Sequence, residues 1–242
     1  MSKTVLVTGS SRGIGRSIAL RFAKEKYNIV INCVNNHDLL EQLKDEITAM
    51  GADCIAFTGD VSDYDTVSRM FDIIKYKFGS VDVLINNAGI SQIGLFQDLE
   101  RKDWNRIIDT NIGSIYNCCH FAIPDMIKNK QGKIINISSV WGICGASCEV
   151  AYSASKGAVN ALTQALAKEL APSSIQVNAV ACGAIDTQMN SFLSKDEADA
   201  LNEEIPAGRM GSADEVASLV FQIYKSPDYL TGQIIRFDGG WI

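Results

Sequence analysis

Short apolar segments recur along the chain at fairly even intervals. They are rich in valine and isoleucine, and most lack the alternation of polar and apolar residues that marks a half-exposed strand. Uninterrupted runs of this kind are typical of strands that are buried on both faces of a parallel sheet. The pattern predicts strands over Thr4–Val7, Ile29–Cys33, Cys54–Phe57, Val81–Ile85, Lys133–Ile137, Ile175–Ala181 and Gln233–Phe237.

Longer segments with helical periodicity separate these runs. Leu162, Leu166 and Leu170, for example, recur every four residues, and a similar pattern begins at Ile14. Regular alternation of strands and helices predicts right-handed crossovers and a Rossmann-type, doubly wound parallel sheet of seven strands with helices on both faces. No linker or repeat interrupts residues 1–242, so we expect a single domain, in which the irregular stretch 183–211 forms a substrate lid.

The charge balance restricts the class of partner. The chain has 28 acidic residues against 22 lysines and arginines, a net charge of −6, which argues against nucleic acid or an anionic membrane as a partner. No apolar run approaches the ~20 residues of a membrane span, and the first residues lack a signal-peptide pattern. We therefore expect a cytoplasmic protein. The seven cysteines form no CxxC pair and the two histidines stand alone, so no metal site is predicted.

A glycine-rich turn follows the first predicted strand. In Thr8-Gly9-Ser10-Ser11-Arg12-Gly13-Ile14-Gly15, the first glycine permits a tight turn, the second lets a pyrophosphate approach the backbone, and the third lets helix and strand pack closely. The N-terminus of the following helix attracts phosphate. The turn predicts a nucleotide site with contacts from Gly9, Ser11, Arg12, Gly13, Ile14 and Gly15.

The spacing of this turn resembles the cofactor turn of the classical short-chain dehydrogenases/reductases. Asn86-Asn87-Ala88-Gly89 closes the fourth strand, as the family's Asn-Asn-Ala-Gly does, and the resemblance covers essentially the whole chain. It implies further cofactor contacts from Asp60, Val61, Asn87, Ala88, Gly89, Tyr152, Lys156, Ile185 and Thr187. Within the family, the chain most resembles the bacterial 3-oxoacyl-[acyl-carrier-protein] reductases of fatty acid biosynthesis. A small ketone or an acyl thioester, with acyl carrier protein as its carrier, is the substrate that this resemblance implies.

The end of the second strand indicates which dinucleotide is used. Enzymes that use NAD place an acid there to bind the ribose 2′-hydroxyl, but Asn32-Cys33-Val34-Asn35-Asn36 contains no carboxylate. Arg12, inside the glycine turn, is placed to face a 2′-phosphate, and an arginine–phosphate contact is strong and geometrically specific. Both features favour NADP(H). The alternative is that Arg12 is only a solvated surface residue.

A tyrosine and a lysine four residues apart supply the candidate chemistry. Tyr152 and Lys156 share one helix face, and a cation beside a phenol lowers the pKa of that phenol, as an acid catalyst requires. The family resemblance makes Tyr152 the general acid/base and gives Lys156 the roles of tuning it and holding the nicotinamide ribose. It also implies that Ser139 binds the substrate carbonyl and that Asn111 holds a proton-relay water. The resulting reaction is reduction of a ketone to a secondary alcohol.

Several residues keep other substrates open. Of the two positions that match the family's basic carrier-docking residues, Lys130 is basic and Ser173 is not. Glu149, three residues before Tyr152, is either a solvated rim charge or an acid that welcomes an amine. The latter suits relatives thought to reduce an aminopentanone group on a translation-factor lysine. A catalytically silent nucleotide sensor is a third alternative. Cys182 replaces a family proline, which predicts a less rigid turn and an inert, structural thiol.

The family resemblance also implies a homotetramer, with a dimer as the fallback. The predicted helix through Leu162 carries small alanines that would let a second layer approach closely. Trp241 and Ile242 end the sequence on two large apolar side chains. Contact with a partner subunit would explain them; the alternative is that they fold back onto their own chain.

Overall fold

The fold is built on a seven-stranded parallel sheet with the strand order β3-β2-β1-β4-β5-β6-β9. The computed structural model describes residues 2–191 and 193–242. The predicted doubly wound fold is confirmed, and each strand lies within a few residues of its predicted position. The strands are β1 (Thr4–Val7), β2 (Asn28–Cys33), β3 (Cys54–Thr58), β4 (Val83–Asn86), β5 (Gly132–Ser139), β6 (Ile175–Cys182) and β9 (Ile234–Phe237).

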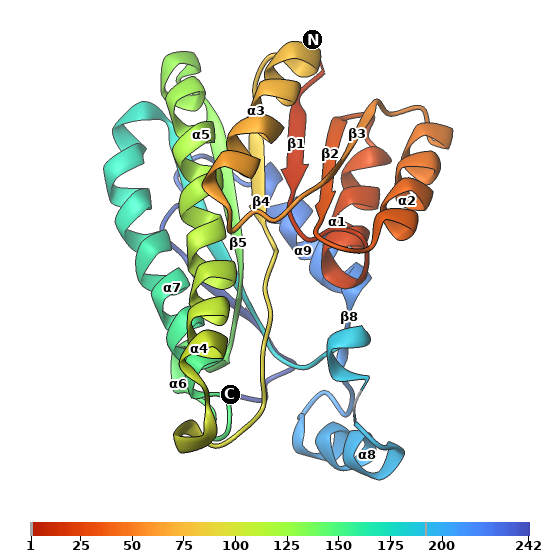
Figure 1. Cartoon of the computed structure of the whole chain (residues 1–242), viewed down its shortest axis with the longest axis vertical. Coiled ribbons are helices and arrows are strands. Elements are labelled where there is room, and N and C mark those ends of the chain that lie inside the picture. Colours follow the sequence, from red (N-terminus) through yellow and green to blue (C-terminus); the bar gives the residue numbers. More distant parts are fainter. Residues whose placement is uncertain (1, 192) are drawn as a thin grey trace.

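Helices cover both faces of this sheet (Figure 1). One face packs against α1 (Gly13–Ala23), α2 (His37–Ala49) and α9 (Ala213–Lys225). The other packs against α3 (Tyr64–Phe78), α5 (Ser114–Asn129) and α7 (Val150–Leu170), with α4 (Arg101–Ile108) beside α7. Because the sheet is buried between two layers, its strands are mostly apolar on both faces, which explains why most of them lack alternation.

The strand order places a crevice at one end of the sheet. The chain moves outward from β1 to β2 and β3, then returns to add β4 on the other side of β1. In open α/β sheets, ligands bind outside the carboxyl ends of the strands at this point of reversal. The first turn after β1 and the segment after β4 meet there, so the two glycine-containing motifs are brought to one place.

The predicted lid segment, residues 183–211, extends beyond the carboxyl ends of the strands (Figure 1). It begins with β7 (Ile185–Asp186) and contains α8 (Lys195–Glu204), which starts at a capping box formed by Ser194 and Glu197. None of the α8 residues is buried. β8 (Gly211–Ser212) pairs with β7 and closes the segment. Its action as a lid stays a prediction.

None of the helices in the described part of the chain combines the length and the apolar character that crossing a membrane would require.

Candidate active site

The glycine turn forms a close-packed cradle between β1 and α1. Gly9 has φ +62°, and a Cβ there would lie 2.9 Å from the Cα of Ala88. A Cβ on Gly15 would lie 2.6 Å from the carbonyl oxygen of Gly9. Side chains are therefore excluded at these two positions, and Gly13 (φ +55°) leaves the backbone free at the start of α1. The cradle fits the pyrophosphate of a dinucleotide, which the helix N-terminus would attract.

Hydrogen bonds from Thr8 lock this turn to the segment after β4. Its Oγ1 accepts from the backbone N–H groups of Asn87 and Ala88, both at 3.0 Å. The Asn87 side chain in turn donates to the carbonyl oxygens of Thr8 and Gly9, both at 2.9 Å. These contacts explain why the two motifs occur together: each supplies the partners that fix the backbone of the other.

The adenosine end of the cleft is polar but carries no acid at the end of β2. Asn32 instead ties β2 to the next loop, donating to the carbonyl oxygens of Phe57 and Gly59 at 3.1 and 2.9 Å. Arg12 is exposed at the rim, where its Nη1 donates to the Oε1 of Gln188 in the lid segment at 2.6 Å. The guanidinium therefore lies where the glycine turn and the lid segment meet.

Asp60 and Val61, two of the predicted cofactor contacts, differ in exposure: Asp60 is exposed and Val61 is buried. The Asp60 carboxylate accepts hydrogen bonds from the backbone N–H and the hydroxyl of Ser62, at 2.9 and 2.8 Å. Val61 is buried, and its carbonyl oxygen accepts a bond from the Asn117 side chain. This network fixes the loop after β3 in a defined conformation beside the crevice.

A cleft of about 750 Å³ opens at the carboxyl ends of the strands and contains the candidate catalytic groups. Ser139 ends β5, and its hydroxyl lies near that of Tyr152 on α7, close enough to act on the Tyr152 pKa. Lys156 lies one turn further along α7, with its Nζ 5.6 Å from the centre of the Tyr152 ring. The buried Nζ donates to the carbonyl oxygen of Ile137 at 2.9 Å. Ile14, Gly89, Ile185 and Thr187 also line the cleft.

Asn111 lies directly behind this cleft, in a π-helical turn (Asp109–Gly113) between α4 and α5. Its fully buried side chain accepts from the Ile90 N–H and donates to the Ile90 carbonyl oxygen and to the Ser155 hydroxyl, at 2.8 to 2.9 Å. A Cβ on Gly89 would lie 3.4 Å from both Asn111 Oδ1 and Lys156 Nζ. The structure therefore brings all four predicted catalytic residues together.

The pKa values of this pair differ from the expected pattern. Burial raises the pKa of Tyr152, and this outweighs the lowering by its hydrogen bond with Ser139. The expected lowering by Lys156 is not found, because the Nζ is directed to the Ile137 carbonyl oxygen and lies several ångströms from the ring. Burial lowers the pKa of Lys156 to about 8. Tyr152 is thus held as a neutral phenol, the form that can donate a proton.

The pKa of Lys156 predicts a basic limit for activity. A lysine is charged below its pKa, so the cation beside Tyr152 is lost as the pH rises through about 8. We expect kcat/KM for NADPH, which reports the free enzyme, to fall by about tenfold per pH unit above that value. Initial rates between about pH 6 and 10 test this, and a flat profile through pH 9.5 would contradict it.

Cys182 is the last residue of β6. It is buried, and it pairs with Ser139 of β5 on one side and Phe237 of β9 on the other. The strand ladder therefore holds the backbone at Cys182 itself, and the lower rigidity of the turn that follows stays a prediction. Burial raises the pKa of the thiol to about 12, although nearby Lys156 acts to lower it. The thiol stays neutral, in agreement with a structural role.

Several residues of the cleft were not identified from the sequence. Ser155, which holds Asn111, lies between Tyr152 and Lys156, and its spacing offered a signal. No local pattern pointed to the wall residues Ser91, Ile93, Met189, Leu193 and Leu201. Trp241 also lines the cleft and packs against Trp141 of the same chain, so the alternative of a folded-back tail describes it better than contact with a partner subunit.

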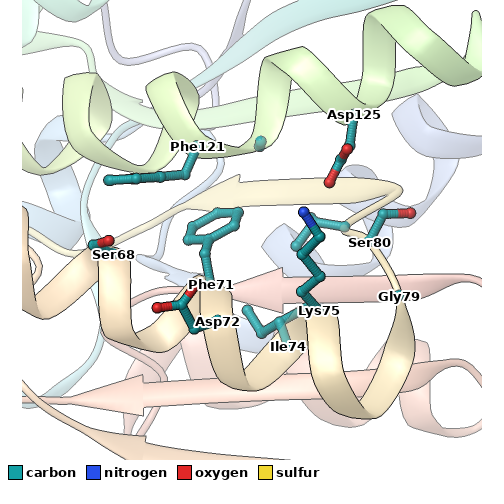
Figure 2. Close-up of a pocket in the computed structure, with 11 residues that line it drawn as sticks. Ser68, Phe71, Asp72, Ile74, Lys75, Gly79, Ser80, Phe121 and Asp125 are labelled. Atoms are coloured by element: carbon teal, nitrogen blue, oxygen red, sulfur yellow. The ribbon is translucent and has the colours of Figure 1, made fainter.

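A second, smaller hollow of about 120 Å³ lies between α3 and α5 (Figure 2). Phe71 and Phe121 stack across it with ring centres 5.7 Å apart, and Lys75 and Asp125 lie at its rim. It reaches Ser80 and Val81, which precede β4, and therefore lies toward the amino-terminal end of that strand. None of the candidate catalytic residues lines this hollow.

Comparisons with known proteins agree with this geometry. The family model described as short chain dehydrogenase matches residues 3–198. The 3-oxoacyl-[acyl-carrier-protein] reductase FabG of Staphylococcus epidermidis is 41% identical over 241 residues, covering 99% of each chain. The Bacillus subtilis protein named uncharacterized oxidoreductase YmfI is 37% identical over 243 residues, covering 100% of this chain and 99% of its own length.

A solved structure gives the same result for the fold. The crystal structure of a protein from Agrobacterium tumefaciens, provisionally named a gluconate dehydrogenase, superposes with a TM-score of 0.93. The two sequences are 34% identical, and the match covers 99% of this chain and 95% of the other. Fold, site and sequence together define an oxidoreductase of the kind that acts on CH–OH groups. The chain belongs to the short-chain dehydrogenase family, and within it is similar to the FabG reductases.

Proposed function

We propose that the protein is an NADPH-dependent ketoreductase. The observation that carries this is the convergence of Ser139, Tyr152 and Lys156 on one cleft that continues to the glycine cradle. When bound, the nicotinamide supplies the hydride. The Ser139 hydroxyl binds and orients the carbonyl oxygen, and the Tyr152 hydroxyl gives that oxygen a proton. Lys156 holds the ribose hydroxyls through its charged Nζ, which donates hydrogen bonds.

Asn111 has a proposed role in returning a proton to Tyr152 from the interior side of the cleft. Its side chain is hydrogen-bonded to the backbone N–H and carbonyl groups of Ile90, and Ser155 fixes its orientation. A buried amide with fixed partners can keep one water in place, and such a water would return a proton to Tyr152 through Lys156 after each turnover.

A 3-oxoacyl thioester is the substrate that we favour. The support is similarity over nearly the full chain to proteins named 3-oxoacyl-[acyl-carrier-protein] reductase. The cleft also has an apolar wall that suits an acyl chain, formed by Ile93, Met189, Leu193 and Leu201. Exposed Lys130, at the end of α5, is one cation available to an acidic carrier protein.

The substrate is tested by comparing three ketones at equal concentration with NADPH: acetoacetyl-carrier protein, the free acetoacetyl thioester and an amino-ketone. We expect the highest kcat/KM for the carrier-bound thioester and at least about tenfold less for the free one, because docking adds binding energy remote from the reacting carbon. Equal values for the two thioesters would contradict carrier docking, and a preference for the amino-ketone would favour the second candidate.

The second candidate is a reductase of an amine-bearing ketone, such as an aminopentanone group on a translation-factor lysine. Glu149 favours it, because this carboxylate lines the cleft and accepts a hydrogen bond from Ser91, which also lines it. An acid in that position would attract an ammonium group. For this candidate, Glu149→Gln should raise KM for the amino-ketone and leave KM for an uncharged β-ketoester unchanged.

We also propose a closed, symmetric homotetramer. The outer face of α7 exposes the small residues Ala158, Ala161 and Ala165, which permit close helix packing. On the neighbouring α5, Tyr116 is 56% exposed. Light scattering at micromolar concentration should give about four times the mass of the 26.3 kDa chain. Twice that mass would support the dimer, and a monomer that still consumes NADPH would contradict assembly while leaving the catalytic proposal intact.

A further inference from the structure

The penultimate residue of the sequence is part of the wall of the cleft. Trp241 lines the same cavity as Ser139 and Tyr152. Its indole packs edge-on against that of Trp141, with ring centres 5.0 Å apart and an angle of 61° between the planes. Trp141 is itself tied to the reaction centre, because its backbone N–H donates to the Ser139 Oγ at 3.2 Å. The two indoles are therefore held at a defined place beside the carbonyl-binding hydroxyl.

The C-terminal tail is built to hold Trp241 there. The Asp238 carboxylate accepts hydrogen bonds from the N–H groups of Gly240 and Ile242 at 3.0 and 3.2 Å. Its carbonyl oxygen accepts one from Trp241 at 3.3 Å. Gly239 and Gly240 have φ values of +67° and +85°, a conformation that L-residues rarely adopt, and they turn the chain back toward the cleft. This network holds residues 238–242 in one defined conformation.

The tail is also joined to the lid segment. The Ala207 N–H donates to the Gly239 carbonyl oxygen at 3.1 Å. The two segments pack so closely that a Cβ on Gly239 would lie 2.8 Å from Cγ2 of the Ile205 side chain. Trp241 thus packs against Trp141, the first residue of α6 (Trp141–Cys144), and the chain just before it is bonded to the end of the lid segment. A wall supported in this way cannot yield to a bulky ligand without disturbing both neighbours.

We infer that Trp241, supported by Trp141, is a specificity-determining residue that selects ketones with an unbranched carbon chain next to the carbonyl. The inference rests on the proposed ketoreductase function. Both indoles line the same cleft as Ser139. The apolar wall of Ile93, Met189, Leu193 and Leu201 lines it too and would contact the rest of an unbranched chain. A branch at the carbon next to the carbonyl collides with the wall. In apolar pockets a single extra methyl group changes kcat/KM by about 10- to 200-fold.

The test compares ethyl acetoacetate with ethyl 2-methylacetoacetate as substrates for the whole protein and NADPH. The wild type should prefer the unbranched ester by at least about tenfold in kcat/KM. Trp241→Ala should raise KM for the unbranched ester, keep kcat within about twofold, and remove most of the preference, since the lost contact binds substrate and takes no part in chemistry. The Kd of NADPH should not change.

Three variants keep the result interpretable. Trp241→Phe retains an aromatic ring and should restore most of the preference, even if the alanine variant folds poorly. Trp141→Phe should reduce the preference in part. Ile242→Ala changes the 38% exposed last residue, which does not line the cleft, and should behave as the wild type.

Two results would count against the inference. If Trp241→Ala folds and its ratio of kcat/KM between the two esters is unchanged, the role of Trp241 as a wall is contradicted. The proposed function is unaffected by that result. A wild type that reduces neither ester nor acetoacetyl-carrier protein would overturn both the wall and the proposed function.

Discussion

Tyr152→Phe is expected to lower turnover by at least about 10²-fold, the usual contribution of a general acid, while NADPH binds nearly as before. The substitution removes one hydroxyl and retains the ring. That hydroxyl lies in the same cleft as Ser139 at the end of β5, so its loss takes away the proton donor beside the serine. No other side chain among the candidate catalytic groups combines a transferable proton with this position. Stopped-flow or steady-state absorbance measurements at 340 nm give the rate.

A matched control separates chemistry from stability. Tyr229 is 97% exposed and remote from the cleft lining, so Tyr229→Phe should leave turnover unchanged. Thermal unfolding of both variants should remain within a few degrees of the wild type. A Tyr152→Phe protein with normal turnover would contradict the proposed mechanism, whatever the substrate.

Arg12→Ala should weaken NADPH binding by more than tenfold, which corresponds to about 1.4 kcal/mol. The Kd for NADH should change little, because the guanidinium is proposed to read only the 2′-phosphate. Arg12 is available for this role: it is exposed at the rim of the cradle and bonded to the neutral Gln188 side chain, which can be exchanged for an anion. Fluorescence titration with both cofactors measures the two Kd values.

Arg16 supplies the control for this experiment. It lies one turn further along α1 and pairs with Glu46 at 2.6 Å, away from the glycine turn. Arg16→Ala should therefore leave both cofactor affinities unchanged. Equal losses for NADPH and NADH in Arg12→Ala would show that Arg12 does not distinguish the two cofactors.

The fold could be predicted from the sequence because its signals are local. Short, mostly apolar runs such as Thr4–Val7 are dictated by burial on both faces, and the structure places a strand there. The glycine turn could be predicted as well. Gly9 and Gly15 are required because a side chain at either position would collide with the turn itself or with the Asn86–Gly89 segment. In motifs of this kind, the spacing of the residues is enough to show why each glycine is needed.

The parts that the sequence did not predict depend on distant contacts or on burial. The position of Trp241 results from a reversal at Gly239 and Gly240 that brings it to Trp141, 100 positions earlier in the numbering. The i,i+4 spacing of Tyr152 and Lys156 gave their shared face, but not the Ile137 carbonyl oxygen that holds the Lys156 Nζ. Side-chain direction and desolvation therefore set the pKa values in a way that spacing alone could not show.

Reduction of a ketone at the expense of NADPH is the proposed activity of this cleft. The most direct measurement is the absorbance at 340 nm of the purified protein with ethyl acetoacetate and either NADPH or NADH. We predict a steady fall in absorbance with NADPH. Consumption of NADH at an equal subsaturating concentration should be at least about tenfold slower, and Tyr152→Phe should lose the signal. Tight binding of NADPH without consumption, for this ester and for acetoacetyl-carrier protein alike, would contradict this activity and would identify a nucleotide-binding sensor instead.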